Sequence, residues 1–146
     1  MYRWFAGAVV WKREEGKIYL LVQDSKSMDQ RYICKPLQTK FPGGTNRGHK
    51  EDSSASETLI RELEEETNLR LRLGVRPRIL RVIGRQVFFL VSIDDCVGIL
   101  RREQILDGDD TLSPPYWVKA DELGRVLYKT HQYALHRTLQ YFNLVG

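Results

Sequence analysis

Residues 43–69 read GGTNRGHKEDSSASETLIRELEEETNL, and this stretch decides the fold. Ser54 followed by Glu57 has the spacing of a capping box, in which two side chains bond the free backbone N–H groups of a first helical turn. The apolar residues that follow recur at helical spacing: Ala55, Leu59 and Leu63. The sequence therefore predicts a helix over residues 54–67, with Asn68 as a left-handed cap at its end.

Three glutamates of the predicted helix share one side. At about 100° of rotation per residue, Glu62, Glu65 and Glu66 fall within an arc of about 100°, whereas Glu64 points elsewhere. Carboxylates at this spacing repel one another and lose hydration beside an apolar face, so a positive charge is expected there. Mg²⁺ prefers oxygen ligands and commonly binds carboxylates, water and substrate phosphates. A glutamate-rich helix face that is simply solvated is the alternative.

Two glycines precede the predicted helix, in the run Phe41-Pro42-Gly43-Gly44. Proline and glycine interrupt regular structure, so a loop is expected here, directly ahead of the helix. Glycines at a strand end also let backbone carbonyl and amide groups approach a ligand closely. Gly43 and Gly44 are therefore candidate substrate-binding residues, although a plain tight turn would explain them equally well on their own.

Together these residues resemble the signature of the Nudix hydrolase family, G-x5-E-x7-R-E-U-x-E-E-x-G-U, where U is a bulky aliphatic residue. The second half of the signature is matched at these positions: Arg61, Glu62, Leu63, Glu65, Glu66 and Leu69. The resemblance extends over nearly the whole chain in its order of elements. It implies an α/β fold class, a Nudix-type α/β/α sandwich with a mixed β-sheet, formed by a single domain over residues 1–146.

Two positions depart from the family pattern. Counting back from Arg61, the first glutamate of the signature falls on Ser53, and the loop after Gly44 is longer than the pattern allows. Glu51 or Asp52 could fold back into the missing position, and the sequence leaves this open. Asn68 stands where the family has glycine, a mild change because asparagine tolerates the same left-handed conformation.

The resemblance implies the hydrolysis of a pyrophosphate bond in a nucleoside diphosphate derivative, with water attacking phosphorus in the presence of Mg²⁺ or Mn²⁺. It makes Glu62, Glu65 and Glu66 metal ligands, together with the carbonyl group of Gly43. It also implies that Arg61 orients the glutamates.

The general base is left open between two places. In some relatives it lies in the signature, which makes Glu62 or Glu65 the candidate. In others it lies in a loop before the last helix, where this chain carries Asp107, Asp109 and Asp110. Gly108 gives that loop the freedom to fold over a pocket. Glu103 lies nearby but is assigned to a charged surface with Arg101 and Arg102, and an ordinary acidic turn remains the alternative for each aspartate.

Outward from the signature, apolar runs and alternation predict strands. A hairpin is expected from runs 5–11 and 18–22 around a polar turn at 12–17. Residues 24–30 and 45–53 are expected to be exposed loops. Further strands are expected at these ranges: 32–34, 69–73, 79–84, 86–93 and 116–118. A helical turn is expected at 121–123, and Leu135, Leu139 and Phe142 mark a closing amphipathic helix.

Composition limits the choice of partners. The chain has 146 residues and a formal net charge of +4, and six arginines crowd residues 70–85. These arginines could form an outward strand face, a phosphate clamp or an RNA track. The longest apolar runs are far shorter than the ~20 residues of a membrane span, and no signal peptide is recognisable, so no membrane partner and a cytoplasmic location are expected. Cys34 and Cys96 are expected to be reduced thiols, with one disulfide left open.

Three function classes follow. The first is a metal-dependent hydrolase acting on a small-molecule nucleotide or on an RNA 5′ end. The second is a Nudix-fold module that binds a nucleotide or RNA without turnover, and the intact glutamates argue against it. The third is an unrelated basic nucleic-acid-binding domain, which would leave the glutamate arc unexplained. No DNA partner is expected, since the chain leaves no room for an attached DNA-binding domain.

Overall fold

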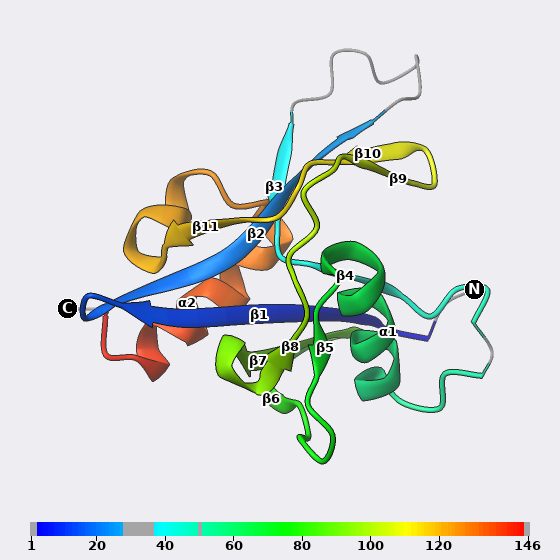
Figure 1. The fold of residues 1–146 in the computed structure, drawn as a ribbon, viewed down its shortest axis with the longest axis horizontal. Helices are drawn as coiled ribbons and strands as arrows, with labels where there is room; N and C mark the ends of the chain where they lie inside the picture. The colour runs from blue at the N-terminus through cyan, green and yellow to red at the C-terminus, as the bar shows by residue number, and fades with distance from the viewer. Residues whose placement is uncertain (1–2, 28–36, 50, 145–146) are drawn as a thin grey trace.

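A computed structural model describes residues 3–27, 37–49 and 51–144 of the chain. A mixed sheet forms the centre of the molecule, and one α-helix lies on each side of it (Figure 1). The larger strands are β1 (Phe5–Glu14), β2 (Lys17–Ser27), β6 (Arg78–Ile83), β7 (Gln86–Ser92) and β11 (Tyr116–Lys119). The short strands are β3 (Gln38–Lys40), β4 (Gly43–Thr45), β5 (Arg70–Leu71), β8 (Cys96–Val97), β9 (Ile105–Asp107) and β10 (Asp110–Leu112).

The sheet is mixed because β1 runs parallel to β7 and antiparallel to β2 and β4. The strand order is β6-β7-β1-β2-β10-β9, and β2 also pairs with β3 and β11. The long strand β2 therefore reaches from the centre of the sheet to the β9–β10 hairpin. Strand β2 thus lies between this hairpin on one edge and β3 on the other.

Alternating residues of the central strands face opposite sides of the sheet. Val9 and Leu20 pack in one apolar core with α2 (Gln132–Tyr141), and Ala8 and Leu21 pack in a second core with α1 (Ala55–Thr67). Both faces of the sheet are thus covered, which confirms the α/β/α sandwich. Within the described ranges, no helix is long and apolar enough to cross a membrane.

Helix α1 begins and ends where the sequence predicts. The hydroxyl of Ser54 accepts a hydrogen bond from the backbone N–H of Glu57, and Asn68 adopts the left-handed conformation at φ 70°. The glycines ahead of the helix differ from the prediction, because Gly43 and Gly44 pair with β1 as part of a strand. A longer connection, residues 46–54, then separates this strand from the helix.

Several other boundaries differ from the predictions. The β1–β2 turn is only Glu15-Gly16, both at positive φ, so the strands continue through most of the predicted polar turn and β2 extends to Ser27. Strand β5 is short, and Leu73 is fully exposed rather than half-buried. The predicted strand at 32–34 lies outside the described residues. The predicted strands at 79–84 and 86–93 and the closing helix are confirmed.

Candidate functional site

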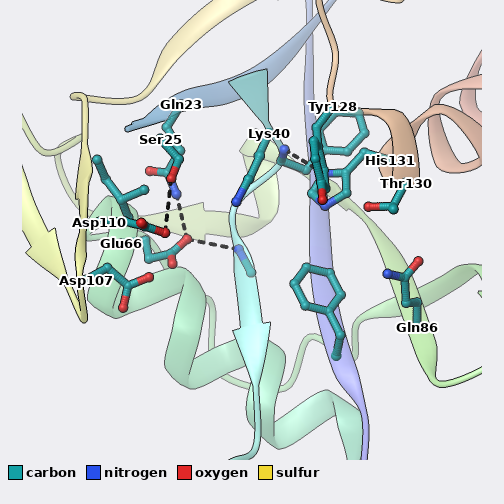
Figure 2. Close-up of a pocket in the computed structure, with 14 residues that line it drawn as sticks. Gln23, Ser25, Lys40, Glu66, Gln86, Asp107, Asp110, Tyr128, Thr130 and His131 are labelled. Carbon is teal, nitrogen blue, oxygen red and sulfur yellow. Dashed lines mark hydrogen bonds between the residues drawn. The ribbon is translucent and has the colours of Figure 1, made fainter. Parts of the chain in front are cut away.

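A cavity of about 230 Å³ opens between helix α1, strands β2 and β4, the β9–β10 hairpin and the turn before α2 (Figure 2). One end is acidic, because Glu66, Asp107 and Asp110 line it. The other end is aromatic, and its lining includes Phe5, Phe41, Tyr128 and His131. A ligand that fills the cavity therefore meets carboxylates at one end and ring faces at the other.

Glu66 is the most buried carboxylate of the acidic end, with 4% of its surface exposed. Its Oε1 accepts two hydrogen bonds, from Gln23 Nε2 at 2.6 Å and from the backbone N–H of Gly43 at 2.9 Å. Burial raises its pKa to about 8, and repulsion from Glu62 and Asp107 adds to this effect against the two hydrogen bonds.

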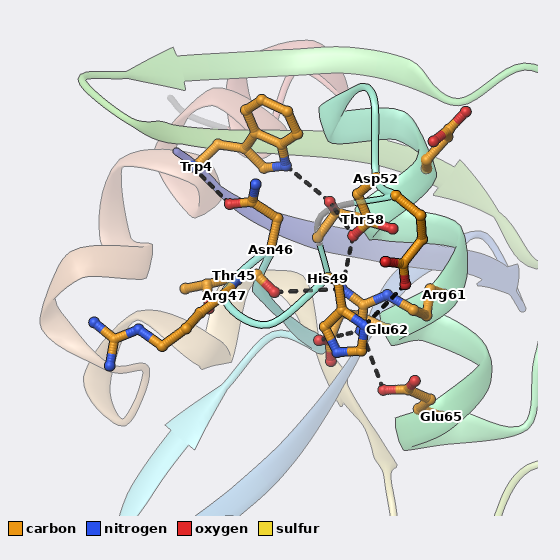
Figure 3. A network of polar contacts seen from close by, with 12 residues as sticks. Trp4, Thr45, Asn46, Arg47, His49, Asp52, Thr58, Arg61, Glu62 and Glu65 are labelled. Carbon is orange, nitrogen blue, oxygen red and sulfur yellow. Dashed lines mark hydrogen bonds and ion pairs between the residues drawn. The ribbon is translucent and has the colours of Figure 1, made fainter. Parts of the chain in front are cut away.

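Arg61 lies at the centre of a network on the same helix (Figure 3). Its Nη1 donates to Glu62 at 3.0 Å and to Glu65 at 3.4 Å, and its Nη2 donates to Asp52 at 2.8 Å. Burial disfavours the charged guanidinium, but the bonds to Asp52 and Glu62 outweigh this and raise the pKa of Arg61. Burial also raises the pKa of Glu62, although the bond from Arg61 acts in the opposite direction.

The arc of the helix predicts that Glu62, Glu65 and Glu66 face one cavity. In the structure they do not all do so. Glu66 lines the cavity, whereas Glu65 faces an outer hollow together with Arg61 and Glu64. The Glu62 and Glu65 carboxylates lie against Arg61, whose Nη1 pairs with both. Across the described part of the chain, no three His, Cys, Asp or Glu side chains are grouped closely enough to hold a metal ion as they lie.

The donor chemistry nevertheless fits a hard divalent cation. In addition to burial, repulsion from Glu62 and Asp107 raises the pKa of Glu66, and repulsion from Glu65 and Asp107 raises that of Glu62. A cation would relieve this repulsion, and all these groups offer oxygen ligands. The backbone of β4 also leaves space for one of them, because a β-carbon at Gly44 would lie 2.5 Å from the carboxyl carbon of Glu62.

The predicted loop of aspartates is a hairpin whose turn is Gly108-Asp109. Asp107 ends β9 and Asp110 begins β10, and both line the cavity. The Ser25 hydroxyl donates to Asp110 Oδ2 at 3.5 Å. Asp109 is exposed and does not line the cavity. The structure therefore brings two of the three predicted aspartates to Glu66.

Asp52 is the residue of the longer loop that pairs with Arg61, whose Nη2 donates to Asp52 Oδ2 at 2.8 Å. Its Oδ2 also accepts a hydrogen bond from the hydroxyl of Thr58 at 2.8 Å, and its side chain is 6% exposed. The bond from Arg61 holds the pKa of Asp52 below its ordinary value. Glu51 is largely exposed and pairs with His49 instead. The loop 45–53, expected to be exposed, thus contains a buried carboxylate, and Asn46 is buried as well.

Sequence reasoning missed three residues of the site. Gln23 follows the apolar run of strand β2, and nothing in the sequence marks it as a site residue. Arg101 is expected at the surface, yet only 7% of it is exposed. His131 is one of three histidines spread along the sequence, and their spacing does not indicate a site. Its Nδ1 accepts the backbone N–H of Phe41 at 3.1 Å, and its ring stacks on the Phe41 ring with centroids 5.7 Å apart. Burial lowers the pKa of His131 to about 3, and Lys40 adds to this, so the imidazole is neutral.

The six arginines of residues 70–85 are all exposed, and none of them lines this cavity. Arg72 donates to the backbone carbonyl of Asp94, and Arg78 lies over the ring of Tyr141. Of the three interpretations of this segment, the structure favours an outward face over a phosphate clamp at the cavity. Cys96 is a buried free thiol, and Cys34 lies outside the described residues.

Comparison with known proteins agrees with this architecture. The family model of the NUDIX domain matches residues 1–140, so the chain belongs to the Nudix family. Curated protein sequences include no significant match.

Solved structures share the fold at low sequence identity. An Ap4A hydrolase of C. elegans is 15% identical with a TM-score of 0.60, over 95% of this chain and 96% of that one. A MutT structure, from work on Aliivibrio salmonicida and Vibrio cholerae, has the same identity and TM-score over 95% and 98%. A mutT/nudix family protein of Listeria innocua is 16% identical with a TM-score of 0.60, over 97% and 94%.

Proposed function

We propose that this chain hydrolyses a pyrophosphate bond in a nucleoside diphosphate derivative and requires Mg²⁺ or Mn²⁺. The observation that carries the proposal is the cavity itself. A buried carboxylate, Glu66, is held by two donors at one end, and ring faces line the other. This division matches a substrate with a polyphosphate group and a planar base. Membership of the Nudix family supports the same reaction class.

Glu62, Glu65, Glu66 and the carbonyl group of Gly43 are the residues that would hold the cation. A divalent cation bound there would neutralise charge on the phosphate oxygens. Arg61 orients Glu62 and Glu65 through its Nη1 group, and Asp52 holds Arg61 in turn through Nη2. We therefore infer that Asp52, supplied by the longer loop, takes the bracing role of the missing signature glutamate.

The attacking water needs a base close to the reacting phosphorus. Asp107 and Asp110 are the better candidates of the hairpin because both line the cavity, whereas Asp109 does not. Glu62 and Glu65 are the alternative within the signature helix. Burial raises the pKa of Glu62, and a carboxylate with a raised pKa is a stronger base.

The aromatic end supports a nucleotide as the substrate. Phe5 and Tyr128 are the half-buried rings of this end, and they lie against the buried, mutually stacked pair of Phe41 and His131. Stacking on aromatic side chains is a common way to bind a base. Two structural neighbours are an Ap4A hydrolase and a MutT protein, so dinucleoside polyphosphates and nucleoside triphosphates come first as candidates. Sugar nucleotides and RNA 5′ ends complete the set.

A substrate panel tests the proposal. Each compound is incubated with the protein and Mg²⁺ or Mn²⁺, and the release of phosphate, pyrophosphate or nucleotide is measured beside a chelator control. Cation-dependent release from at least one compound is expected. Saturable binding without release from any of them would instead indicate a Nudix-fold binding module, the alternative function, and would overturn the proposal.

A further inference from the structure

Arg101 lies behind the acidic end of the cavity, and its guanidinium reaches four oxygens. Its Nε donates to the backbone carbonyl of Glu66 at 2.6 Å, and its Nη1 donates to the backbone carbonyl of Glu103. Its Nη2 donates to Gln23 Oε1 at 3.2 Å and to the carbonyl of Ser113 at 2.8 Å. The guanidinium therefore connects the end of α1, strand β2 and the segments that flank the β9–β10 hairpin.

The partners of Arg101 are unusual for a buried arginine. All four are neutral oxygens, and no ion pair joins its guanidinium to a carboxylate in the part of the chain that the structure describes. Burial lowers the pKa of Arg101, while the charge of Glu66 acts against this. A buried guanidinium without a paired carboxylate costs free energy, so its retention calls for a role beyond filling space.

The bond to Gln23 fixes the orientation of an amide group. An arginine can only donate, so the group that faces Arg101 Nη2 must be the amide oxygen of Gln23. The amide nitrogen then faces the other way, toward Glu66, where its hydrogen bond measures 2.6 Å. Reversing the amide would place a donor against Arg101 and an acceptor against Glu66. Arg101 therefore makes Gln23 a donor to the carboxylate.

The same arrangement decides which oxygen of the Glu66 carboxylate is available to a ligand. The bonds from Gln23 and from the backbone of Gly43 both end on Glu66 Oε1. Among the described residues, no hydrogen bond ends on Oε2 of this side chain. Glu66 lines the cavity, so Oε2 is the oxygen left for a ligand. Arg101 also holds the backbone of the same residue, which fixes both ends of the glutamate.

We propose that Arg101 is a positioning residue that acts through Gln23 to present Glu66 Oε2 to a divalent cation. This inference rests on the proposed function, because the cation is the one that the hydrolysis requires. Arg101 itself stays behind the carboxylate and does not line the cavity.

Two substitutions and their combination test the relay. Arg101→Met, Gln23→Met and the double variant are compared with wild type for the affinity of Mn²⁺ alone, measured by electron paramagnetic resonance, and for kcat and KM. Each single change is expected to weaken Mn²⁺ binding by about 10- to 100-fold, the usual effect of losing a group that orients a ligand. The double variant is expected to lose little more than the worse single one, because both act on one carboxylate.

Further variants separate positioning from folding. Gln23→Glu keeps the acceptor for Arg101 but sets a carboxylate against Glu66, so it should weaken Mn²⁺ binding at least as much as Gln23→Met. Arg101→Lys keeps the charge but not the fork of donors, and should recover only part of the affinity. Arg102→Met, at the exposed neighbouring position, is the matched control and should resemble wild type. If Arg101→Met does not fold, the two Gln23 variants still decide the test.

The failures of the two proposals are distinguishable. If the wild-type protein neither binds Mn²⁺ nor releases product, the proposed function fails. If wild type does both, but the Gln23 and Arg101 variants bind Mn²⁺ as tightly and lose only thermal stability, the positioning role is overturned. Strictly additive losses in the double variant would overturn it as well.

Discussion

Two arginines support helix α1, Arg61 along its length and Arg101 at its end. They differ in the kind of oxygen to which they donate. Arg61 donates to three carboxylates, those of Asp52, Glu62 and Glu65. Arg101 donates to three backbone carbonyls and one amide oxygen. Arg61 therefore competes with any cation for carboxylate oxygens, whereas Arg101 leaves these oxygens free. The acidic end of the cavity needs the kind of support that Arg101 gives, because a carboxylate that binds a cation must be held without being neutralised.

The largest expected effect concerns the two aspartates that line the same acidic end of the cavity as Glu66. If Asp107 or Asp110 is the general base, its substitution by alanine should lower kcat by about 10²- to 10⁴-fold while Mn²⁺ still binds. Asp109→Ala is the matched control, because Asp109 lies on the exposed turn. Turnover and Mn²⁺ affinity are measured separately. Near-normal turnover in all three variants would move the base to Glu62 or Glu65.

The next effect compares two neighbouring glutamates of the helix. Glu66→Gln removes a charge at the cavity and should weaken cation binding and lower kcat by about 10²-fold or more, since charge stabilisation by a metal ion is worth several kcal/mol. Glu64→Gln, at an exposed position outside the cavity, should have little effect. Steady-state kinetics and Mn²⁺ titration measure both. Equal losses in the two variants would contradict the geometry.

A smaller effect tests the support around Arg61. Asp52→Asn keeps the shape of the side chain but removes the charge that faces Arg61 Nη2, so Arg61 should shift further toward Glu62 and Glu65. Cation affinity should fall by about 10-fold, as for other groups that orient ligands. Glu51→Gln is the control because Glu51 is exposed. Should Glu51→Gln prove the more damaging of the two, Asp52 would not be the residue that braces Arg61.

The smallest effect is on stability without added cation. Because the folded pKa of Glu66 is about 8 and the unfolded one about 4.5, the folded protein keeps a proton that the unfolded chain releases. Stability should therefore fall as pH rises through this window, by at most about 1.4 kcal/mol per pH unit. His131 has the opposite effect, which fades as the pH rises above its ordinary pKa of 6.5.

Denaturant unfolding between pH 6.5 and pH 8 measures the contribution of Glu66 as the difference in slope between wild type and Glu66→Gln, because the contribution of His131 is common to both. Glu66→Gln should make the stability less dependent on pH across this range, and Glu64→Gln should keep the wild-type slope. Added Mg²⁺ should also reduce the slope in the wild-type protein, since it favours the ionised carboxylate. An unchanged slope in Glu66→Gln would show that another group titrates.

The difference between the two arginines also explains what the sequence could predict. Arg61 and its glutamates lie within one helix, so spacing alone brings them together, and the caps at Ser54 and Asn68 bound that helix correctly. The sandwich follows from apolar runs that can be recognised locally. Gln23 and Arg101 meet across 78 residues, and nothing near either one marks the contact.

Other errors had physical causes of the same kind. Polar residues in the β1–β2 hairpin continue the strands because backbone pairing does not require apolar side chains, so the turn is only Glu15-Gly16. Gly43 and Gly44 form a strand because β1 approaches them closely, and small residues permit this. Asp52 is buried because Arg61 and Thr58 satisfy it, and only the fold brings these partners to the loop.

The residues of the site lie far apart in the sequence, and this has a consequence for when the site forms as the chain is synthesised on the ribosome. The signature helix is complete at Thr67, but Arg101 follows 35 residues after Glu66, and His131 meets Phe41 across 90 residues. Contacts between such distant residues form slowly during folding. A nascent chain that has emerged only through its signature therefore carries the carboxylates without the donors that orient them. The cavity is complete only after the turn before α2 has emerged and closes the aromatic end.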